Sequence, residues 1–261
     1  MKTILLCGAN GFIGKNILKR FSAKENYRIR ATYFNSVNKM SHSYPVEWVH
    51  ADLRNPNDVC RVMKGVDIVM QYAATTTGAK DIVSKPYIHV TDNAVMNSII
   101  LREAFEEGVE HFIMPSCTIM YPASEKPLKE TDFNENERIF PKYFGAGNTK
   151  VYLEKMCEFY SSFGKTKHTV LRQSNIYGPY DKYDLEKSHV FGATITKVMT
   201  AKDTITVWGT GEEQRDFLHV DDLLDLIEAA IEKQKTPYEL MNASYGSSIS
   251  IDNLVKTIVN V

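Results

Sequence analysis

A glycine-rich run near the start of the chain has the residue types and spacing to bind a phosphate group. The run is Gly8-Ala9-Asn10-Gly11-Phe12-Ile13-Gly14, and it separates the apolar residues 4–7 from a helical pattern. A strand, a glycine turn and a helix N-terminus in this order present backbone N–H groups to an anion. Gly8 permits the tight turn, Gly11 leaves room for a pyrophosphate and Gly14 allows close helix–strand packing. The run therefore predicts a dinucleotide site formed by Gly8, Asn10, Gly11, Phe12, Ile13 and Gly14.

Two later segments match the same kind of site. Ala51-Asp52-Leu53 follows an expected strand over residues 46–50, and residues 66–74 form an apolar run that ends in Ala73 and Ala74. Taken alone, Asp52 would be an ordinary turn residue at a strand end. Together with the glycine spacing G-x-x-G-x-x-G, these features resemble the short-chain dehydrogenase/reductase superfamily. The resemblance implies that Asp52 and Leu53 lie beside the adenine of a cofactor, which passes over Ala73 and Ala74.

Four motifs in the second half sharpen this resemblance. They are Asn175-Ile176-Tyr177-Gly178-Pro179, Ser188-His189-Val190, Val207-Trp208-Gly209-Thr210-Gly211 and the run from Arg215 to Asp222. Together they are similar to the extended branch of the superfamily, the nucleotide-sugar epimerases and dehydratases, and most similar to the GDP-L-fucose synthases. The resemblance implies an NAD(P)-dependent enzyme that epimerises and reduces a 4-keto-6-deoxy GDP-sugar.

The resemblance also assigns binding residues position by position. The further cofactor contacts that it implies are Lys150, Gln173, Asn175 and Ile176. The nucleotide-sugar contacts that it implies are His189, Lys197, Trp208 and Arg215.

For two of these residues, the chemistry of the side chain allows a binding role or a structural one. The Arg215 guanidinium can bind two diphosphate oxygens at once; the alternative is an ion pair with Glu213 or Asp216. Trp208 is either a core residue or, beside a Gly-Thr-Gly turn, a platform that stacks on a base.

Epimerisation next to a ketone needs two titratable groups, one on each face of the carbon. The resemblance places one at His189, which could otherwise be structural, and the other at a cysteine after the fifth strand. Cys117 lies in that segment, but its register is off. The family's cysteine position holds Ile119, and Cys117 stands where a catalytic Ser or Thr is usual. Either the loop is shifted or Cys117 has a different role. The nearby hydroxyls that could polarise the keto oxygen are Ser116 and Thr118.

The largest departure from the family pattern is at residue 146. The superfamily's general acid/base is a tyrosine one helical turn before a lysine, which lowers the pKa of the phenol. Lys150 fits this pattern, but position 146 is alanine. Tyr143 lies two turns, or about 10 Å, before Lys150, and Tyr152 lies on another face of the helix. We therefore expect Ala146 to impair catalysis, unless one of the epimerisation groups serves as the base.

The elements that must position these residues alternate between strand-like and helical patterns, which favours βαβ units and a parallel sheet. We expect strands at 3–7, 28–33, 46–50, 66–71, 110–115, 168–173 and near 205–207. We expect helices at 12–22, 56–63, 90–107, 147–163, 188–200 and 220–233, and a surface loop over 122–144. The fold class is therefore α/β, a Rossmann-type doubly wound parallel sheet with a small C-terminal substrate lobe.

The domain boundary follows from the same pattern. Residues 1–175 are expected to form the dinucleotide-binding domain, with segments of 205–235 contributing, and residues 176–261 to form mainly the substrate lobe. Because the resembled family continues beyond Val261, we expect part of that lobe to be absent here.

Composition narrows the classes of function. The chain has 261 residues and a net charge of −1, which gives no sign of nucleic-acid or anionic-membrane binding. No apolar run approaches transmembrane length. The four cysteines lack metal-ligand spacing, and Cys7 and Cys157 sit in apolar patterns. We therefore expect reduced thiols, no metal and a cytoplasmic protein.

The choice of cofactor is weakly marked. The second expected strand ends in Thr32-Tyr33-Phe34-Asn35-Ser36, without the carboxylate that binds an adenosine ribose diol. No arginine stands at this strand end for a 2′-phosphate, although Lys39 is near. The cofactor is NAD(H) or NADP(H), and NADP is favoured because the resembled subfamily uses it.

The helices at 90–107 and 147–163 carry more apolar residues than one sheet face can cover: Val95, Ile99, Ile100, Val151, Met156 and Phe159. The resembled family pairs these helices in a four-helix interface, so we expect a homodimer; the alternative is that the residues serve the core alone.

Two other functions stay open. One is a nucleotide-sugar C4 epimerase, and the other is a cofactor-binding protein without catalysis, for which Ala146 argues. The retention of Lys150, His189 and Arg215 favours an enzyme.

Overall fold

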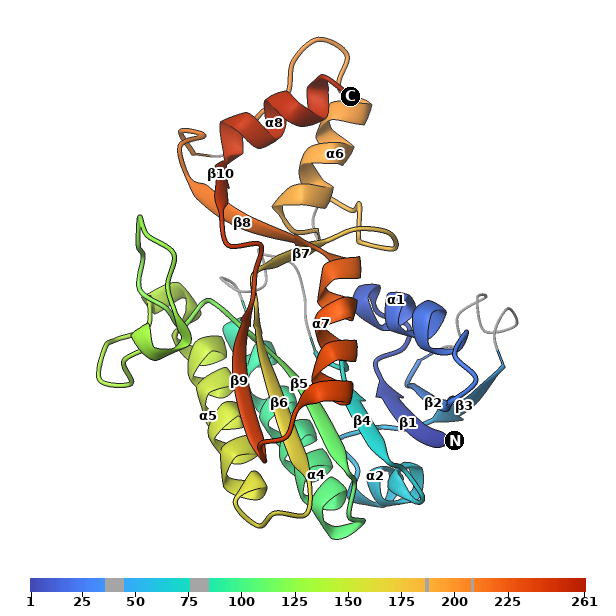
Figure 1. The fold of residues 1–261 in the computed structure, drawn as a ribbon. Coiled ribbons are helices and arrows are strands. Elements are labelled where there is room, and N and C mark those ends of the chain that lie inside the picture. Colours follow the sequence, from blue (N-terminus) through green and yellow to red (C-terminus); the bar gives the residue numbers. More distant parts are fainter. Residues whose placement is uncertain (36–44, 76–84, 186–187, 208) are drawn as a thin grey trace.

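The computed structural model describes the whole chain except residues 36–44, 76–84, 186–187 and 208. Helices cover both faces of a seven-stranded sheet, and a smaller lobe stands above one end of it (Figure 1). This confirms the expected α/β class.

The large sheet is parallel in every pair and has the strand order β3-β2-β1-β4-β5-β6-β9. Its strands are β1 (Lys2–Cys7), β2 (Tyr27–Tyr33), β3 (Val46–His50), β4 (Ile68–Gln71), β5 (His111–Cys117), β6 (Lys167–Gln173) and β9 (Tyr238–Ala243). The strand order reverses between β1 and β4. In open α/β sheets, ligands bind at this switch point, outside the carboxyl ends of the strands.

Five helices form the two covering layers. On one face lie α1 (Phe12–Phe21) and α7 (Val220–Lys233); on the other lie α2 (Pro56–Met63), α4 (Thr91–Glu106) and α5 (Phe144–Ser161) (Figure 1). Each layer has its own apolar core, around Phe21 and Ile227 on the first face and around Phe112 and Leu153 on the second. The expected helices are confirmed in place, although α5 begins three residues before the expected 147.

The lobe is built from short elements. Strands β7 (Asn175–Tyr177), β8 (Gln214–His219) and β10 (Ser248–Ser250) form a small mixed sheet, and α6 (Val190–Thr200) and α8 (Ile251–Val259) complete the lobe. The strand expected near 205–207 is wrong: the structure assigns none to these residues, and β8 begins at Gln214. Three short 3-10 helices, η2 (Pro86–His89), η3 (Glu130–Asp132) and η4 (Pro141–Tyr143), lie in the connections.

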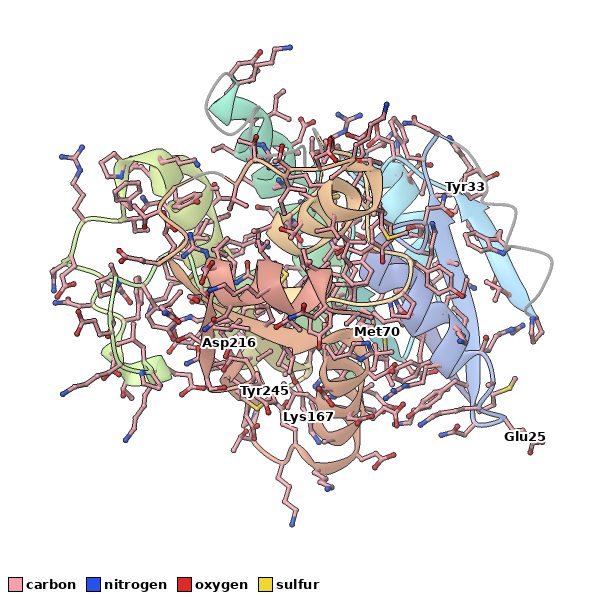
Figure 2. All side chains as sticks on the ribbon, turned by 90° about the horizontal axis from the view of Figure 1, so that it is seen from above. Glu25, Tyr33, Met70, Lys167, Asp216 and Tyr245 are labelled. Atoms are coloured by element: carbon pink, nitrogen blue, oxygen red, sulfur yellow. The ribbon has the colours of Figure 1, made fainter. Side chains whose placement is uncertain are left out.

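The lobe and the large sheet are interleaved along the chain. After β8, helix α7 packs on the large sheet and strand β9 pairs with β6. The connection from β9 back to β10 is fixed to β8 by Asp216, whose carboxylate accepts hydrogen bonds from the backbone N–H of Tyr245 (3.0 Å) and Gly246 (2.8 Å). Figure 2 shows Asp216 and Tyr245 in this lobe.

None of the helices in the described part of the chain is both long and apolar enough to cross a membrane. All four cysteines are free, and Cys7 and Cys157 are buried, as expected for reduced core thiols.

Candidate active site

The glycine turn is held together by two close backbone approaches. Gly8 has φ +76°, and a Cβ there would lie 2.4 Å from the carbonyl oxygen of Tyr72 at the end of β4. A Cβ at Gly14 would lie 2.2 Å from the carbonyl oxygen of Gly8. Both positions therefore require glycine for packing.

Gly11 differs from its two neighbours in the motif. Its φ of −75° is open to any residue, and a Cβ would meet only the Gly8 carbonyl oxygen, at 3.2 Å. Gly11 precedes α1, whose first turn has neither a capping side chain nor an acidic residue. The first N–H groups of α1 thus keep their capacity to bind an anion, and the space beside Gly11 fits a diphosphate.

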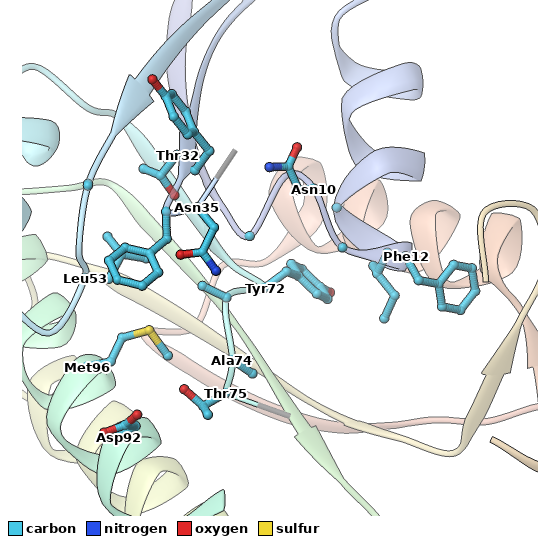
Figure 3. Close-up of a pocket in the computed structure, with 18 of the residues that line it drawn as sticks. Asn10, Phe12, Thr32, Asn35, Leu53, Tyr72, Ala74, Thr75, Asp92 and Met96 are labelled. Atoms are coloured by element: carbon cyan, nitrogen blue, oxygen red, sulfur yellow. The ribbon is translucent and has the colours of Figure 1, made fainter. Parts of the chain in front are cut away.

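A cleft of about 860 Å³ lies in front of this turn (Figure 3). The sequence-predicted residues that line it are Gly8, Asn10, Gly11, Phe12, Ile13, Gly14, Asp52, Leu53, Ala73, Ala74 and His189. In Figure 3, Leu53 and Thr32 lie toward one end of the cleft and Phe12 toward the other. The remaining predicted site residues within the described chain do not line it.

The end of the cleft at Asp52 and Leu53 contains Arg54, an arginine that no sequence motif indicated. Arg54 pairs with the Asp52 carboxylate through two contacts of 3.0 Å and with Asp92 at 3.0 Å, and its guanidinium lies 5.4 Å from the centre of the Phe34 ring. Arg54 also holds the pKa of Asp52 below its usual range. An arginine therefore does stand at the end of β2, supplied by the turn after β3.

Three amide side chains hold the segment that follows β4. Asn93 of α4 bonds to both backbone groups of Thr75 (2.9 and 3.0 Å), and Asn97 accepts a bond of 2.8 Å from Gln71. Gln71 in turn bonds to the backbone of Ala73. These hydrogen bonds fix residues 73–75, which form one wall of the cleft. No sequence motif indicated them.

Lys150 reaches the end of β5 from helix α5. Its Nζ donates a hydrogen bond of 2.8 Å to the Pro115 carbonyl oxygen, and burial lowers the pKa of its ammonium. Burial raises the pKa of the nearby Cys117 thiol, which therefore stays protonated at neutral pH. Thr118 is half-buried just after the strand.

Ser116 is hydrogen-bonded to a buried side chain of α5 and does not line the cleft. Its hydroxyl donates to Glu154 of α5, which forms a buried ion pair of 2.7 Å with Arg172 of β6. Both side chains of this pair are almost inaccessible to solvent, so it fixes α5 against the sheet rather than facing a ligand. Thr118 is therefore the more accessible of the two hydroxyls proposed to polarise a ketone.

Neither Tyr143 nor Tyr152 takes the place of the tyrosine expected at position 146. Ala146 is half-buried in the first turn of α5. The Tyr143 ring packs against Phe140, with ring centres 6.2 Å apart. The Tyr152 hydroxyl lies 3.1 Å from Ser98 of α4, on the α4 side of the helix.

The lobe contributes Asp181, Lys182 and His189 to the lining of the cleft. His189 immediately precedes α6, and its exposed side chain lines the cleft. Gln173 contacts the cleft residue Tyr72 (3.3 Å), whereas Asn175 donates to the Asp216 carbonyl oxygen and Ile176 packs in the core. Lys197 donates to the Thr206 carbonyl oxygen at 2.7 Å. Trp208 lies outside the described residues.

Arg215 is exposed on β8. Its guanidinium donates to the carbonyl oxygen of Gln214 at 2.7 Å and forms no ion pair with a described carboxylate. The Asp216 carboxylate is taken by backbone N–H groups, and Glu213 accepts from the N–H of Gly211. Backbone N–H groups, chiefly, and the charge of Arg215 lower the pKa of Glu213, so Glu213 lies within the electrostatic influence of Arg215.

The chain matches known proteins over almost its whole length. The model of the NAD-dependent epimerase/dehydratase family matches residues 4–244. The GDP-L-fucose synthase of Azorhizobium caulinodans is 27% identical over 96% of this chain and 77% of its own length. The GDP-L-colitose synthase of Yersinia pseudotuberculosis is 24% identical over 99% and 81%.

Solved structures give the same fold. The UDP-glucose 4-epimerase of Thermotoga maritima, determined with UDP-glucose, superposes with a TM-score of 0.84 at 22% identity and covers 99% of this chain and 82% of its own. A GDP-D-glycero-L-gluco-heptose synthase of Campylobacter jejuni, determined with NADPH, superposes with a TM-score of 0.80 at 19% identity, over 99% and 85%. At these identities the likeness establishes the fold alone.

The difference between the glycines gives a prediction. In Gly11→Val the side chain enters the space beside the helix N-terminus, so the affinity for both NAD(H) and NADP(H) should fall at least about a hundredfold while the melting temperature changes little. Gly14→Ala is the matched control: its methyl group collides with the Gly8 carbonyl, so the fold itself should lose stability. Fluorescence titration and thermal melting measure both effects. Undiminished cofactor binding in Gly11→Val would contradict the assignment.

Proposed function

The chain belongs to the NAD-dependent epimerase/dehydratase family, and we propose that it is a nucleotide-sugar epimerase/reductase whose substrate is a 4-keto-6-deoxy GDP-sugar. We further propose that Ala146 lowers its turnover. The observation that carries the proposal is the shared cleft: the glycine turn of the sheet and His189 of the lobe line one cavity. The names of the two GDP-sugar synthases among its relatives support the choice of a GDP-sugar.

The cofactor fits the cleft through residues already described. The turn from Gly8 to Gly14 would hold the pyrophosphate, and Asp52 and Leu53 the adenine end. When bound, the nicotinamide supplies the redox chemistry at the 4-keto carbon. Lys150 keeps a fixed ammonium beside the end of β5, and Thr118 offers a hydroxyl to the keto oxygen.

His189 and Arg215 serve the sugar nucleotide. The imidazole of His189 removes or returns a proton at the carbon next to the ketone, because it lies at the cleft and has ring nitrogens that can accept and donate a proton. Arg215 binds the diphosphate. Cys117 stays a candidate for the opposite face of the carbon, where it would act as a protonated thiol.

We propose NADP as the cofactor. The described residues of β2 and the turn that follows it include no carboxylate, and Arg54 supplies a cation at that end of the cleft. Because Asp52 and Asp92 already neutralise Arg54, its gain from a 2′-phosphate is limited. The free thiols fit the cytoplasmic location that we expect.

A prediction for Arg215 tests the substrate site. In Arg215→Met, the loss of a charge-assisted pair to the diphosphate should weaken nucleotide-sugar binding by about 2 kcal/mol, roughly thirtyfold in Kd. Cofactor affinity should not change. The matched control is Arg28→Met, an exposed arginine of β2 on which neither ligand depends. Calorimetric titration with GDP-, UDP- and dTDP-sugars measures the effect. Equal loss of both ligands in Arg215→Met would indicate a structural role instead.

A prediction for Ala146 tests the catalytic assignment. Ala146→Tyr places a phenol one helical turn from Lys150 and should raise turnover by about 10²–10⁴-fold, the usual contribution of a positioned acid/base. Ala146→Phe is the control, because it adds the ring without the hydroxyl and should give no gain. NAD(P)H oxidation with 4-keto-6-deoxy sugar nucleotides measures turnover. A tyrosine variant no faster than the parent would mean that the catalytic position is wrong.

The same assay separates the alternatives. Preferential turnover of a UDP-sugar without net reduction would favour a C4 epimerase. If the parent protein and the Ala146→Tyr variant both bind cofactor and sugar nucleotide but neither turns them over, the result would favour a binding protein.

We also propose a homodimer through α4 and α5. These helices pack on each other, yet Val95, Tyr152 and Phe159 remain 42%, 43% and 53% exposed, whereas Ile100 belongs to the core. Light scattering at micromolar concentration should give about twice the 29.7 kDa of the chain. Phe159→Asp should yield a monomer, because a carboxylate opposes burial at an apolar interface, and Met199→Asp in the lobe is the exposed control. A monomeric parent would rule the dimer out.

A further inference from the structure

The loop between β7 and α6 carries Asp181, and only one of its two carboxylate oxygens accepts a hydrogen bond from a described residue. One oxygen of Asp181 accepts a hydrogen bond of 2.7 Å from the backbone N–H of Lys182. The other, Oδ2, is buried and has no hydrogen-bond partner among the described residues. Asp181 nevertheless lines the same cleft as the glycine turn and His189. A buried carboxylate oxygen is costly unless a partner offers a proton or a positive charge.

His189 needs such a group for its proposed role. It is the residue that precedes the first turn of α6, an eleven-residue helix, and its imidazole makes no capping hydrogen bond there. The N-terminal end of a helix carries a partial positive charge, which disfavours an imidazolium. An acid/base histidine at this place therefore depends on a nearby negative charge to hold its proton.

Asp181 and His189 line the same cleft, and the charge of His189 acts on the Asp181 carboxyl. Burial raises the pKa of the Asp181 carboxyl, whereas the Lys182 N–H and the charges of His189 and Lys182 lower it. These are the two charged groups that act on Asp181. Lys182 and His189 are both exposed and both line the cleft, and of the two charges that of His189 has the larger effect on Asp181.

The loop that bears Asp181 is fixed from both sides. The buried side chain of Asn16 in α1 donates to the Pro179 carbonyl oxygen at 2.8 Å. On the other side, the Lys182 carbonyl oxygen accepts from the Ser188 hydroxyl (2.5 Å) and lies 2.3 Å from where a Cβ at Gly192 would be. The helix that follows the glycine turn and the helix that follows His189 thus set the position of one carboxylate.

We propose that Asp181 is the positioning residue of His189, orienting the imidazole over the cleft and stabilising its protonated form. This inference rests on the proposed acid/base role of His189. It adds a second residue to the epimerisation step. The loop of this residue is held by the hydrogen bond from Asn16, in the helix that follows the glycine turn.

The test is an NMR titration of the histidine imidazoles in the full chain without substrate, with the His189 signals assigned by their loss in His189→Gln. Asp181→Asn keeps the shape and removes the charge. Its His189 titration midpoint should fall by about 0.5–1 pH unit, because a carboxylate near an imidazole favours the charged form. Asp203→Asn is the control: it removes the same charge from an exposed position in the lobe and should leave the midpoint in place.

A kinetic readout accompanies the titration. In D₂O, exchange of the carbon-bound proton of a 4-keto-6-deoxy GDP-sugar should slow about tenfold in Asp181→Asn, with KM changed less than about twofold. An unchanged midpoint in Asp181→Asn, or an equal fall in Asp203→Asn, would overturn the inference. Parent-like exchange in His189→Gln would instead refute the acid/base role of His189, which distinguishes failure of the proposed function from failure of the positioning contact.

Discussion

The contact on which the site depends is the approach of two backbone segments at the Gly8 carbonyl. This oxygen lies so close to Gly14 that no side chain fits between them, while Gly8 itself presses against the end of β4. The contact brings α1 down onto β1 at the point where the strand order reverses. Everything at the cleft is placed relative to this contact: the open N-terminus of α1, the wall after β4 and, through Asn16, the loop of the lobe.

The large sheet could be predicted because its strands are apolar runs between clear helical patterns. β1, β4 and β5 are buried almost throughout, so their composition alone marks them. The lobe lacked this signal. Its strands β7 and β10 have three residues each, and β8 begins with Gln214-Arg215-Asp216, a polar sequence that indicates no strand. Such strands form because the sheet pairs them, and pairing between distant segments leaves no local pattern.

The same contrast between local patterns and contacts of distant residues applies to the site. The cleft residues of the glycine turn were predictable, because their chemistry and their spacing lie within one short segment. Arg54 and Asp181 were not, since each gains its meaning from a partner elsewhere: Arg54 from Asp92 and Phe34, Asp181 from His189. For Ser116 the sequence suggests a functional role that its contacts do not support. Its place in the sequence suggests a catalytic hydroxyl, whereas the buried pair of Glu154 and Arg172 gives that hydroxyl a structural partner.

The groups of the proposed reaction come from two parts of the fold. His189 comes from the lobe, whereas Lys150, Thr118 and Cys117, the candidate for the opposite face of the carbon, lie on α5 or at the end of β5. Lys150 is held by the Pro115 carbonyl and α5 by the ion pair to Arg172, and neither contact involves residue 146. Losing a phenol at that position therefore leaves the scaffold and the exchange chemistry in place. A chain of this kind should retain exchange of the carbon-bound proton even where reduction is slow, because neither His189 nor Cys117 depends on a phenol at position 146.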